Sequence, residues 1–142
     1  MSGERPFHLA LPTQDLQGTE QFYTEILGCS TGRRDKDWID FNFFGHQIVF
    51  HDCGIPPLGL AKNFVDEKEV QIPHFGVILT LEQWKALAQD LENKKILFII
   101  SPYIRFEGTP GEQATMFFLD PNGYALEFKA FASDESIFQP FS

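Results

Sequence analysis

The sequence of 142 residues fits a single domain, and 43% of its residues are hydrophobic, which is enough for a core. Its formal net charge of −9 leaves no basic stripe for nucleic acids or for anionic membrane surfaces. No apolar run approaches the roughly 20 residues that span a bilayer, and no signal-peptide core is present. Two isolated cysteines do not make a disulfide framework. We therefore expect a cytoplasmic protein without nucleic-acid or membrane partners.

The first half of the chain predicts a strand, a helix and three further strands. The first strand covers residues 7–11, and the helix begins near Leu16 with Asp15 as its N-cap. Gly28 ends the helix, because glycine accepts the left-handed conformation found at helix C-termini. The three strands that follow are expected at residues 29–33, 38–44 and 46–51.

The second half predicts the same order of elements. A strand covers residues 74–79, and Thr80 with Gln83 matches a capping box at the start of a helix. Another strand covers residues 96–100. A hairpin then joins residues 115–119 to 124–128 through the Asp120–Gly123 turn. Equivalent strands begin at His8 and His74, 66 residues apart (74 minus 8), so we predict a duplicated βαβββ module and a mixed α+β fold.

The resulting domain organisation is one domain over residues 1–142. Module one covers about residues 6–53 and module two about residues 74–131, with a C-terminal tail at 132–142. Residues 54–73 form the linker, which reads as a long loop, either a lid over a binding site or a plain crossover.

Two histidines and one glutamate predict a metal site. His8 and His74 open equivalent strands of the repeat, so their imidazoles are expected to converge on the axis between the halves. Glu127 alternates with Leu126 and Phe128 in the last strand, where a carboxylate is costly to bury unless it is paired or bound to a metal. Two histidines with one carboxylate is the ligand set of non-haem Fe(II) oxygenases and of several Mn and Zn sites.

Several stretches of the sequence resemble a known family. They are Phe7–Ala10, the helix end Phe22–Gly28, Pro73–Val77 and Asp120–Glu127. Over residues 6–131 the chain is similar to the vicinal oxygen chelate superfamily, which includes glyoxalase I, bleomycin-resistance proteins, fosfomycin-modifying enzymes, methylmalonyl-CoA epimerase and extradiol dioxygenases. Residues 38–47 and 102–107 resemble a single-bicycle subgroup described as predicted extradiol-type dioxygenases. The resemblance implies a half-open mixed β-barrel around one divalent metal held by His8, His74 and Glu127.

The glyoxalase I pattern would place a fourth ligand on the last strand of the first module. Glu127 lies four residues past Gly123, and the residue four past Gly45 is Val49, which cannot ligate a metal. The sequence therefore predicts an open three-ligand site, as in extradiol dioxygenases. A register shift of two would instead bring Gln47 or His51 to the metal, and Gln47 as a ligand would resemble the epimerases.

These features predict an Fe(II)-dependent, extradiol-type dioxygenase acting on a small vicinal diol or similar bidentate oxygen substrate. Mn, Zn or Ni are the other metals considered. The alternatives are a non-catalytic binding or resistance protein, and a metal-dependent isomerase, lyase or thiol transferase of the glyoxalase or epimerase type.

The remaining candidates concern catalysis and substrate binding. His51 is the candidate acid/base, because imidazole titrates near neutral pH, and Tyr103 is the candidate tyrosine beside the metal. Arg105 is a candidate clamp for a substrate carboxylate. Met116 and Phe118 either line an apolar pocket wall on the side of Glu127 or belong to the core. The apolar tail residues Ile137, Phe138 and Phe141 pack on the body or on a second subunit, and we expect a homodimer.

Overall fold

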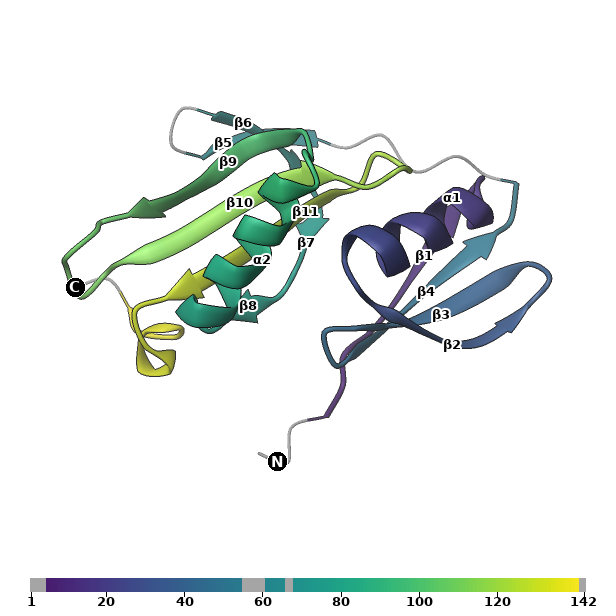
Figure 1. Cartoon of the computed structure of the whole chain (residues 1–142), viewed down its shortest axis with the longest axis horizontal. Helices are drawn as coiled ribbons and strands as arrows, with labels where there is room; N and C mark the ends of the chain where they lie inside the picture. The colour runs from purple at the N-terminus through teal and green to yellow at the C-terminus, as the bar shows by residue number, and fades with distance from the viewer. Residues whose placement is uncertain (1–4, 55–60, 66–67, 141–142) are drawn as a thin grey trace. The chain divides into compact units, whose positions relative to one another are not determined.

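The computed structural model describes residues 5–54, 61–65 and 68–140. The chain forms two compact units, one comprising Met1–Gly59 with Asp120–Tyr124 and the other Leu60–Leu119 with Ala125–Ser142. Each unit contains one βαβββ module (Figure 1). The mixed α+β class with two main sheets is therefore confirmed. No helix in the described residues is long and apolar enough to cross a membrane.

The first module is a four-stranded sheet with the order β1-β4-β3-β2. Its elements are β1 (His8–Thr13), α1 (Leu16–Gln21) continued by a π-helical segment (Phe22–Ile26), β2 (Ser30–Asp35), β3 (Trp38–Phe43) and β4 (His46–Asp52). Strand β1 pairs with β4 in parallel, and the other pairs are antiparallel. The predicted caps are confirmed, since Asp15 accepts a hydrogen bond from the Gly18 amide at 2.9 Å and Gly28 has a φ of 73°.

The core of the first module is aromatic. Tyr23 is fully buried, and its ring lies 5.4 Å from that of Phe41 and 5.1 Å from that of Phe50. Side chains alternate along β3 and β4, so these phenylalanines occupy the face of the sheet covered by the helix. The opposite face carries His8, Asp40, Gln47 and Val49, because cross-strand partners share a face.

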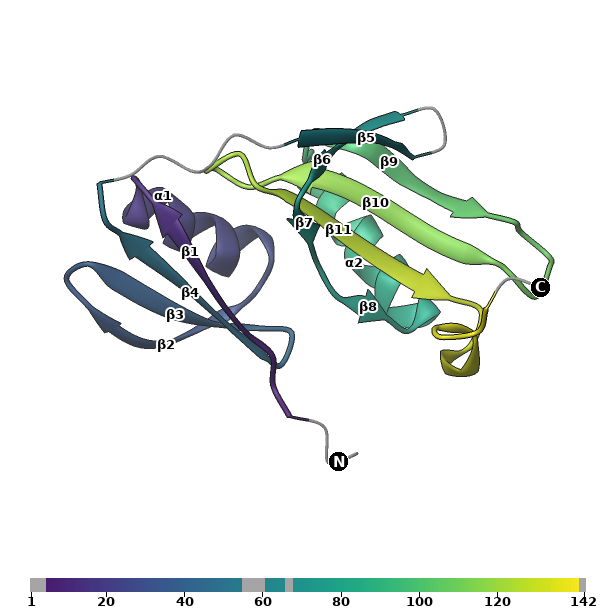
Figure 2. The same ribbon diagram turned by 180° about the vertical axis from the view of Figure 1, so that it is seen from behind.

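The second module has the strand order β7-β11-β10-β9, with β8 also paired to β11. Its elements are β7 (His74–Phe75), β8 (Ile78–Leu79), α2 (Leu81–Asn93), β9 (Phe98–Arg105), β10 (Gln113–Leu119) and β11 (Ala125–Phe131). Helix α2 covers one face of this sheet, lying in front of it in Figure 1 and behind it in Figure 2. The capping box of Thr80 and Gln83 is confirmed.

Two predicted strands of this module have different bounds in the structure. The strand expected at residues 74–79 is interrupted at Gly76 and Val77, so that two short strands run parallel to β11. The strand expected at residues 96–100 covers 98–105 instead and passes through Pro102. Strand β9 stands at the end of the sheet order, where a proline costs no hydrogen bond on the open side.

The linker between the modules is not a plain loop. Strands β5 (Ala61–Val65) and β6 (Lys68–Ile72) form an antiparallel hairpin, which the sequence reading missed. Val70 is buried with Ile100 and Phe117 of the second module, so the end of this hairpin belongs to that core. Residues 55–60 and 66–67 lie outside the described part of the chain.

The tail contains a short 3₁₀ turn (Asp134–Ser136). Ile137 after it is half-buried, whereas Phe138 is 93% exposed. Phe141 lies outside the described residues. Of the three apolar tail residues, Ile137 is the one that the structure shows partly covered.

Candidate functional site

The second module brings His74 and Glu127 together. Strand β7 pairs with β11 so that His74 is opposite Ala125, and Glu127 follows two residues later on the same face. The Nε2 atom of His74 lies 3.2 Å from Oε1 of Glu127, and both side chains are largely buried. Two of the three predicted metal ligands are therefore neighbours.

Neighbouring residues hold both side chains of this pair in place through hydrogen bonds and packing. The Nδ1 atom of His74 lies 2.7 Å from the Gln71 carbonyl oxygen, which only accepts hydrogen bonds, so Nδ1 carries a proton. The hydroxyl of Thr115 donates to the second Glu127 oxygen at 2.6 Å, and the Phe117 ring packs edge-on against His74 with centroids 5.0 Å apart. Nε2 of His74 and Oε1 of Glu127 are thus left to meet a proton or a metal ion.

His8 has a matching arrangement in the first module. It is an exposed residue at the start of β1, opposite Gln47 of β4. Its Nδ1 atom lies 2.7 Å from the Gln47 side-chain oxygen, so that Nε2 is again the nitrogen left for a ligand. No group of three or more His, Cys, Asp or Glu side chains among residues 5–54, 61–65 and 68–140 is gathered closely enough to hold a metal. The three-ligand set stays a prediction.

The strand registers give an independent view of the fourth-ligand position. His74 is opposite Ala125 and Glu127 lies two residues beyond it, whereas His8 is opposite Gln47 and Val49 lies two residues beyond that. Val49, 5% exposed, thus stands where Glu127 stands in the second module. This agrees with the equivalence that the two glycine turns predicted.

The other two candidates on β4 occupy the same face as Val49. Gln47 is engaged on both sides, because its oxygen faces His8 and its Nε2 donates to Asp40 at 3.2 Å. His51 is exposed, and its ring centroid lies 6.5 Å from that of Trp38 on β3. The structure therefore gives Gln47 a hydrogen-bonding role, while the acid/base role of His51 stays a prediction.

Of the two readings of Met116 and Phe118, the structure agrees with the core and not with a pocket wall on the side of Glu127. Met116 is opposite Phe128 and Phe118 is opposite Leu126, and these partners alternate with Glu127. Both side chains are fully buried on the face of helix α2, where the Phe118 ring stacks on that of Phe128. The reason is that side chains alternate along a strand. Phe117 is opposite Glu127 and shares its face, so its neighbours Met116 and Phe118 point to the other face.

Tyr103 and Arg105 do share the face of Glu127. Tyr103 is opposite Thr115, and Arg105 is opposite Gln113, both on β10. Arg105 also packs over the Phe106 ring, 5.2 Å from its centroid. The bulge in this pairing shifts the register, so that Phe117 faces Ile100, and periodicity by itself does not reveal it.

Sequence reading missed three polar residues on these two faces. Thr115 and Lys129 lie opposite each other on β10 and β11, and Asp40 is a buried carboxylate on β3. The signal was available, since Asp40 stands between the apolar Ile39 and Phe41 as Glu127 does between Leu126 and Phe128. A charge at an alternate position of an apolar strand marks a special environment.

A buried polar cluster anchors the Asp120–Gly123 turn to the first module. The Tyr23 hydroxyl donates to Asp120 at 2.9 Å, and the Thr13 hydroxyl donates to the Asn122 side chain at 2.6 Å. Burial raises the pKa of Asp120, although the hydrogen bonds from Tyr23, Tyr124 and Asn122 lower it in part. The Tyr124 amide also donates to Asp120, at 2.9 Å. Because β11 begins at Ala125, the cluster thereby holds the residue that directly precedes the strand of Glu127.

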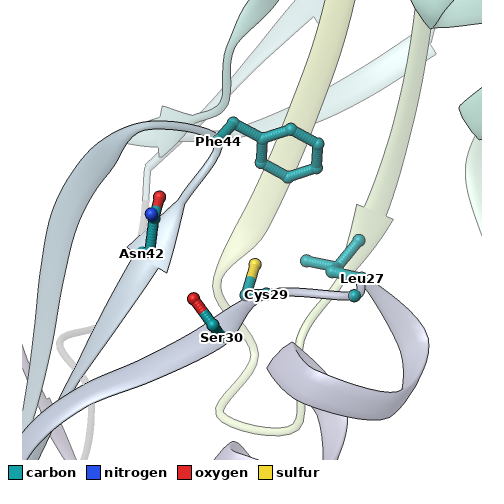
Figure 3. Close-up of a pocket in the computed structure, with 6 residues that line it drawn as sticks. Leu27, Cys29, Ser30, Asn42 and Phe44 are labelled. Carbon is teal, nitrogen blue, oxygen red and sulfur yellow. The ribbon is translucent and has the colours of Figure 1, made fainter.

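The first module also contains a separate open pocket of about 260 Å³ (Figure 3). Its lining residues are Leu27, Gly28, Cys29, Ser30, Asn42 and Phe44. Burial raises the pKa of the Cys29 thiol to about 11, which keeps it neutral and a poor nucleophile. None of the predicted site residues lines this pocket.

Comparison with known proteins agrees with this architecture. A solved structure described as a glyoxalase/bleomycin resistance protein/dioxygenase from Alicyclobacillus acidocaldarius is 31% identical, with a TM-score of 0.78, covering 97% of this chain and 100% of that one. The fosfomycin resistance protein FosX from Listeria monocytogenes is 17% identical with a TM-score of 0.65, covering 96% of this chain and 99% of that one, which shows a shared fold.

Comparison of the sequence gives one similar protein and one matching family model. Glutathione transferase FosA from Serratia marcescens is 27% identical over 124 residues, covering 84% of this chain and 76% of that protein. The family model of the Glyoxalase/Bleomycin resistance protein/Dioxygenase superfamily matches residues 5–128, from the start of the first module into the last strand of the second, β11. The chain therefore belongs to the Glyoxalase/Bleomycin resistance protein/Dioxygenase superfamily.

Proposed function

We propose that the protein is a divalent-metal enzyme that binds a small substrate through two oxygen atoms, with His8, His74 and Glu127 as the metal ligands. The observation that carries the proposal is the 3.2 Å approach of His74 Nε2 to Glu127 Oε1 while Nδ1 of His74 is committed to Gln71. A nitrogen lone pair and a carboxylate oxygen repel each other unless a proton on Nε2 or a metal ion lies between them. A divalent ion satisfies both.

The donor set fits the metals expected from the sequence. Imidazole and carboxylate ligands suit Fe(II), Mn, Zn and Ni, and Fe(II) is the ion we favour because two histidines and one carboxylate leave positions open. Gln71 and Thr115 orient the ligands from outside, as outer partners do in known metal sites. The metal would act as a Lewis acid that lowers the pKa of a substrate hydroxyl.

The other residues of the two faces are proposed to serve the substrate. Val49 occupies the position in the first module that is equivalent to Glu127, and valine cannot bind a metal. The metal therefore keeps open coordination positions, which two oxygen atoms of the substrate fill. His51 accepts or returns a substrate proton, and Tyr103 on the face of Glu127 is the second candidate for this role. Arg105 and Lys129 place positive charge on that same face, which suits a substrate with an anionic group.

Two reactions are proposed, each on its own observation. Extradiol-type oxygenation is favoured by the three-ligand set, by Val49 in the fourth position and by Tyr103 on the sheet face of Glu127, and it would consume oxygen together with a vicinal diol. Transfer of a thiol to a small oxygen-bearing electrophile is favoured by the likeness to the Serratia glutathione transferase. An isomerase and a non-catalytic binding protein are the remaining alternatives on the same fold.

The deciding experiment measures metal, oxygen and thiol on one preparation. Protein purified without added metal is analysed for its elements, and its melting temperature is compared before and after chelation, which should lower it because the metal binds the folded state. Oxygen uptake with a panel of catechols supports the dioxygenase, whereas loss of glutathione with fosfomycin supports the thiol transferase. Bound metal without turnover supports the binding protein. A preparation that takes up none of the four metals overturns the proposal.

We further propose a cytoplasmic homodimer, as expected from the sequence. Leu97 and Phe138 are 92% and 93% exposed, and a subunit interface that covered them would remove apolar surface from water. Sedimentation velocity of the full chain tests the assembly, and a monomer at micromolar concentration contradicts it.

A further inference from the structure

A chain of polar contacts leads away from His8 through the face of the first sheet. His8 Nδ1 lies 2.7 Å from the side-chain oxygen of Gln47, and Gln47 Nε2 lies 3.2 Å from Oδ2 of Asp40. The Nε atom of the exposed Arg33 lies 3.7 Å from the same Asp40 oxygen. Asp40 is only 6% exposed, so that its carboxylate is a fixed acceptor inside the sheet.

The chemistry of these groups allows one orientation of the Gln47 amide. A carboxylate accepts hydrogen bonds and donates none, so the NH₂ group of Gln47 must face Asp40. Its carbonyl oxygen then faces His8, and the imidazole must supply the proton from Nδ1. The reversed amide would put two acceptors together at Asp40, which the buried carboxylate disfavours.

We propose that Gln47 and Asp40 are positioning residues that hold His8 as its Nδ1–H tautomer and present Nε2 outward to a metal ion. The metal part rests on the proposed function; the tautomer part does not. His74 obtains the same tautomer from a main-chain carbonyl, whereas His8 depends on a side chain that substitution can remove. In this arrangement Gln47 orients a ligand and is not itself the fourth ligand.

The first test uses metal-free protein and long-range ¹H–¹⁵N correlation spectra of the histidine rings. We expect neutral His8 to show the Nδ1–H tautomer in the unsubstituted protein. Gln47→Met keeps the length of the side chain but removes both hydrogen-bonding atoms, and it should shift His8 towards the Nε2–H form preferred by free imidazole. Arg33→Gln is the matched control and should leave the tautomer unchanged, because Arg33 is the exposed end of the chain. A His8 tautomer that Gln47→Met leaves unchanged overturns the proposal.

The second test measures Co²⁺ affinity by visible absorption. Gln47→Met should weaken binding by about 10- to 100-fold, the usual cost of losing an outer partner of a ligating histidine. Asp40→Asn preserves size but no longer dictates which end of the Gln47 amide faces it, so it should weaken binding by a smaller factor. Neither change should weaken binding further in a His8→Ala background, because both act through His8.

The outcomes separate this proposal from the proposed function. Unsubstituted protein that binds no Co²⁺ but keeps the Gln47-dependent tautomer refutes the metal site and leaves the positioning role intact. Equal losses from Gln47→Met with and without His8 refute positioning, since Gln47 would then act on the metal directly. Wild-type affinity in Asp40→Asn refutes the orienting role of the carboxylate. Circular dichroism of each metal-free variant identifies misfolded protein, and Gln47→Leu then replaces Gln47→Met.

Discussion

Gly76 lies directly against the main-chain carbonyl of Glu127. A Cβ atom on Gly76 would stand 1.5 Å from that carbonyl oxygen, far inside van der Waals contact. Gly76 separates β7 from β8 at the place where the chain passes the strand of Glu127, so the closeness of the backbones sets how near His74 and Glu127 can lie. The φ of Gly76 is not in the left-handed region, so backbone conformation does not require a glycine here. The reason for the glycine is the lack of space for a Cβ atom.

Gly76→Ala should therefore destabilise the fold and separate His74 from Glu127. We expect a loss of about 1–3 kcal/mol, typical of overpacking, together with weaker metal binding. Chemical denaturation measures the first and elemental analysis the second. Gly111→Ala is the control, because the nearest atom to its added Cβ would be the Thr109 hydroxyl oxygen at 3.8 Å. Equal stability of the two variants would contradict the role given to the Gly76 contact.

Removing a predicted metal ligand should remove the metal. His74→Ala is expected to abolish stoichiometric binding, because the site loses one of its three donors. His46→Ala is the matched control: His46 accepts a hydrogen bond from the Phe7 amide at 2.9 Å and has no place in the predicted site. Elemental analysis of both variants measures the difference. A triple alanine variant of His8, His74 and Glu127 that keeps wild-type metal content means the site is misplaced.

His51 is expected to act on the substrate and not on the metal. His51→Ala should cut turnover by roughly 10²–10⁴-fold, the usual scale for a lost general base, while metal content hardly changes. Val49→Glu should close the open coordination position with a fourth ligand and suppress oxygen chemistry. Turnover and metal content are measured on each variant with the substrate found in the catechol panel. Loss of metal together with activity in His51→Ala would make His51 a ligand instead.

Asp120 should give the stability of the protein a distinctive pH dependence. Burial raises the pKa of Asp120, so the folded state binds this proton more tightly than the unfolded state does. The free energy of unfolding therefore falls as the pH rises from the ordinary aspartate pKa, about 3.9, through the raised value. Asp120→Asn cannot lose a proton and should lack this decrease. Denaturant unfolding of both proteins from about pH 4 upward measures it.

The expected signature is a difference in stability, wild type minus Asp120→Asn, that falls with pH and then levels off. Other titrating groups cancel in that difference. Tyr23→Phe provides a second check: the Tyr23 hydroxyl donates to Asp120 and partly offsets the effect of burial, so its removal should raise the pKa of Asp120 further. A stability difference that rises with pH would contradict a raised pKa.

The sequence by itself determined the duplicated module and its local signals. Asp15, Gly28 and the Thr80–Gln83 capping box act through hydrogen bonds and backbone conformations only a few residues long, so composition and spacing were enough to place them. Strand alternation showed that Glu127 faces away from Leu126 and Phe128, and the repeat made His8 and His74 equivalent. The equivalence of Val49 with Glu127 also followed from counting, and the two parallel registers agree with it.

Only the tertiary structure decided which residues meet across strands. The register of β10 against β11 placed Met116 and Phe118 under helix α2, and the bulge between β9 and β10 set the row of Tyr103. The hydrogen bonds of Gln47 to His8 and Asp40 join residues that are 39 and 7 positions apart. Cross-strand register is fixed by turns, bulges and packing that involve the whole sheet, and a one-residue shift moves every side chain to the other face. That is why the ligand candidates were visible in the sequence, while the residues that hold them became visible only in the fold.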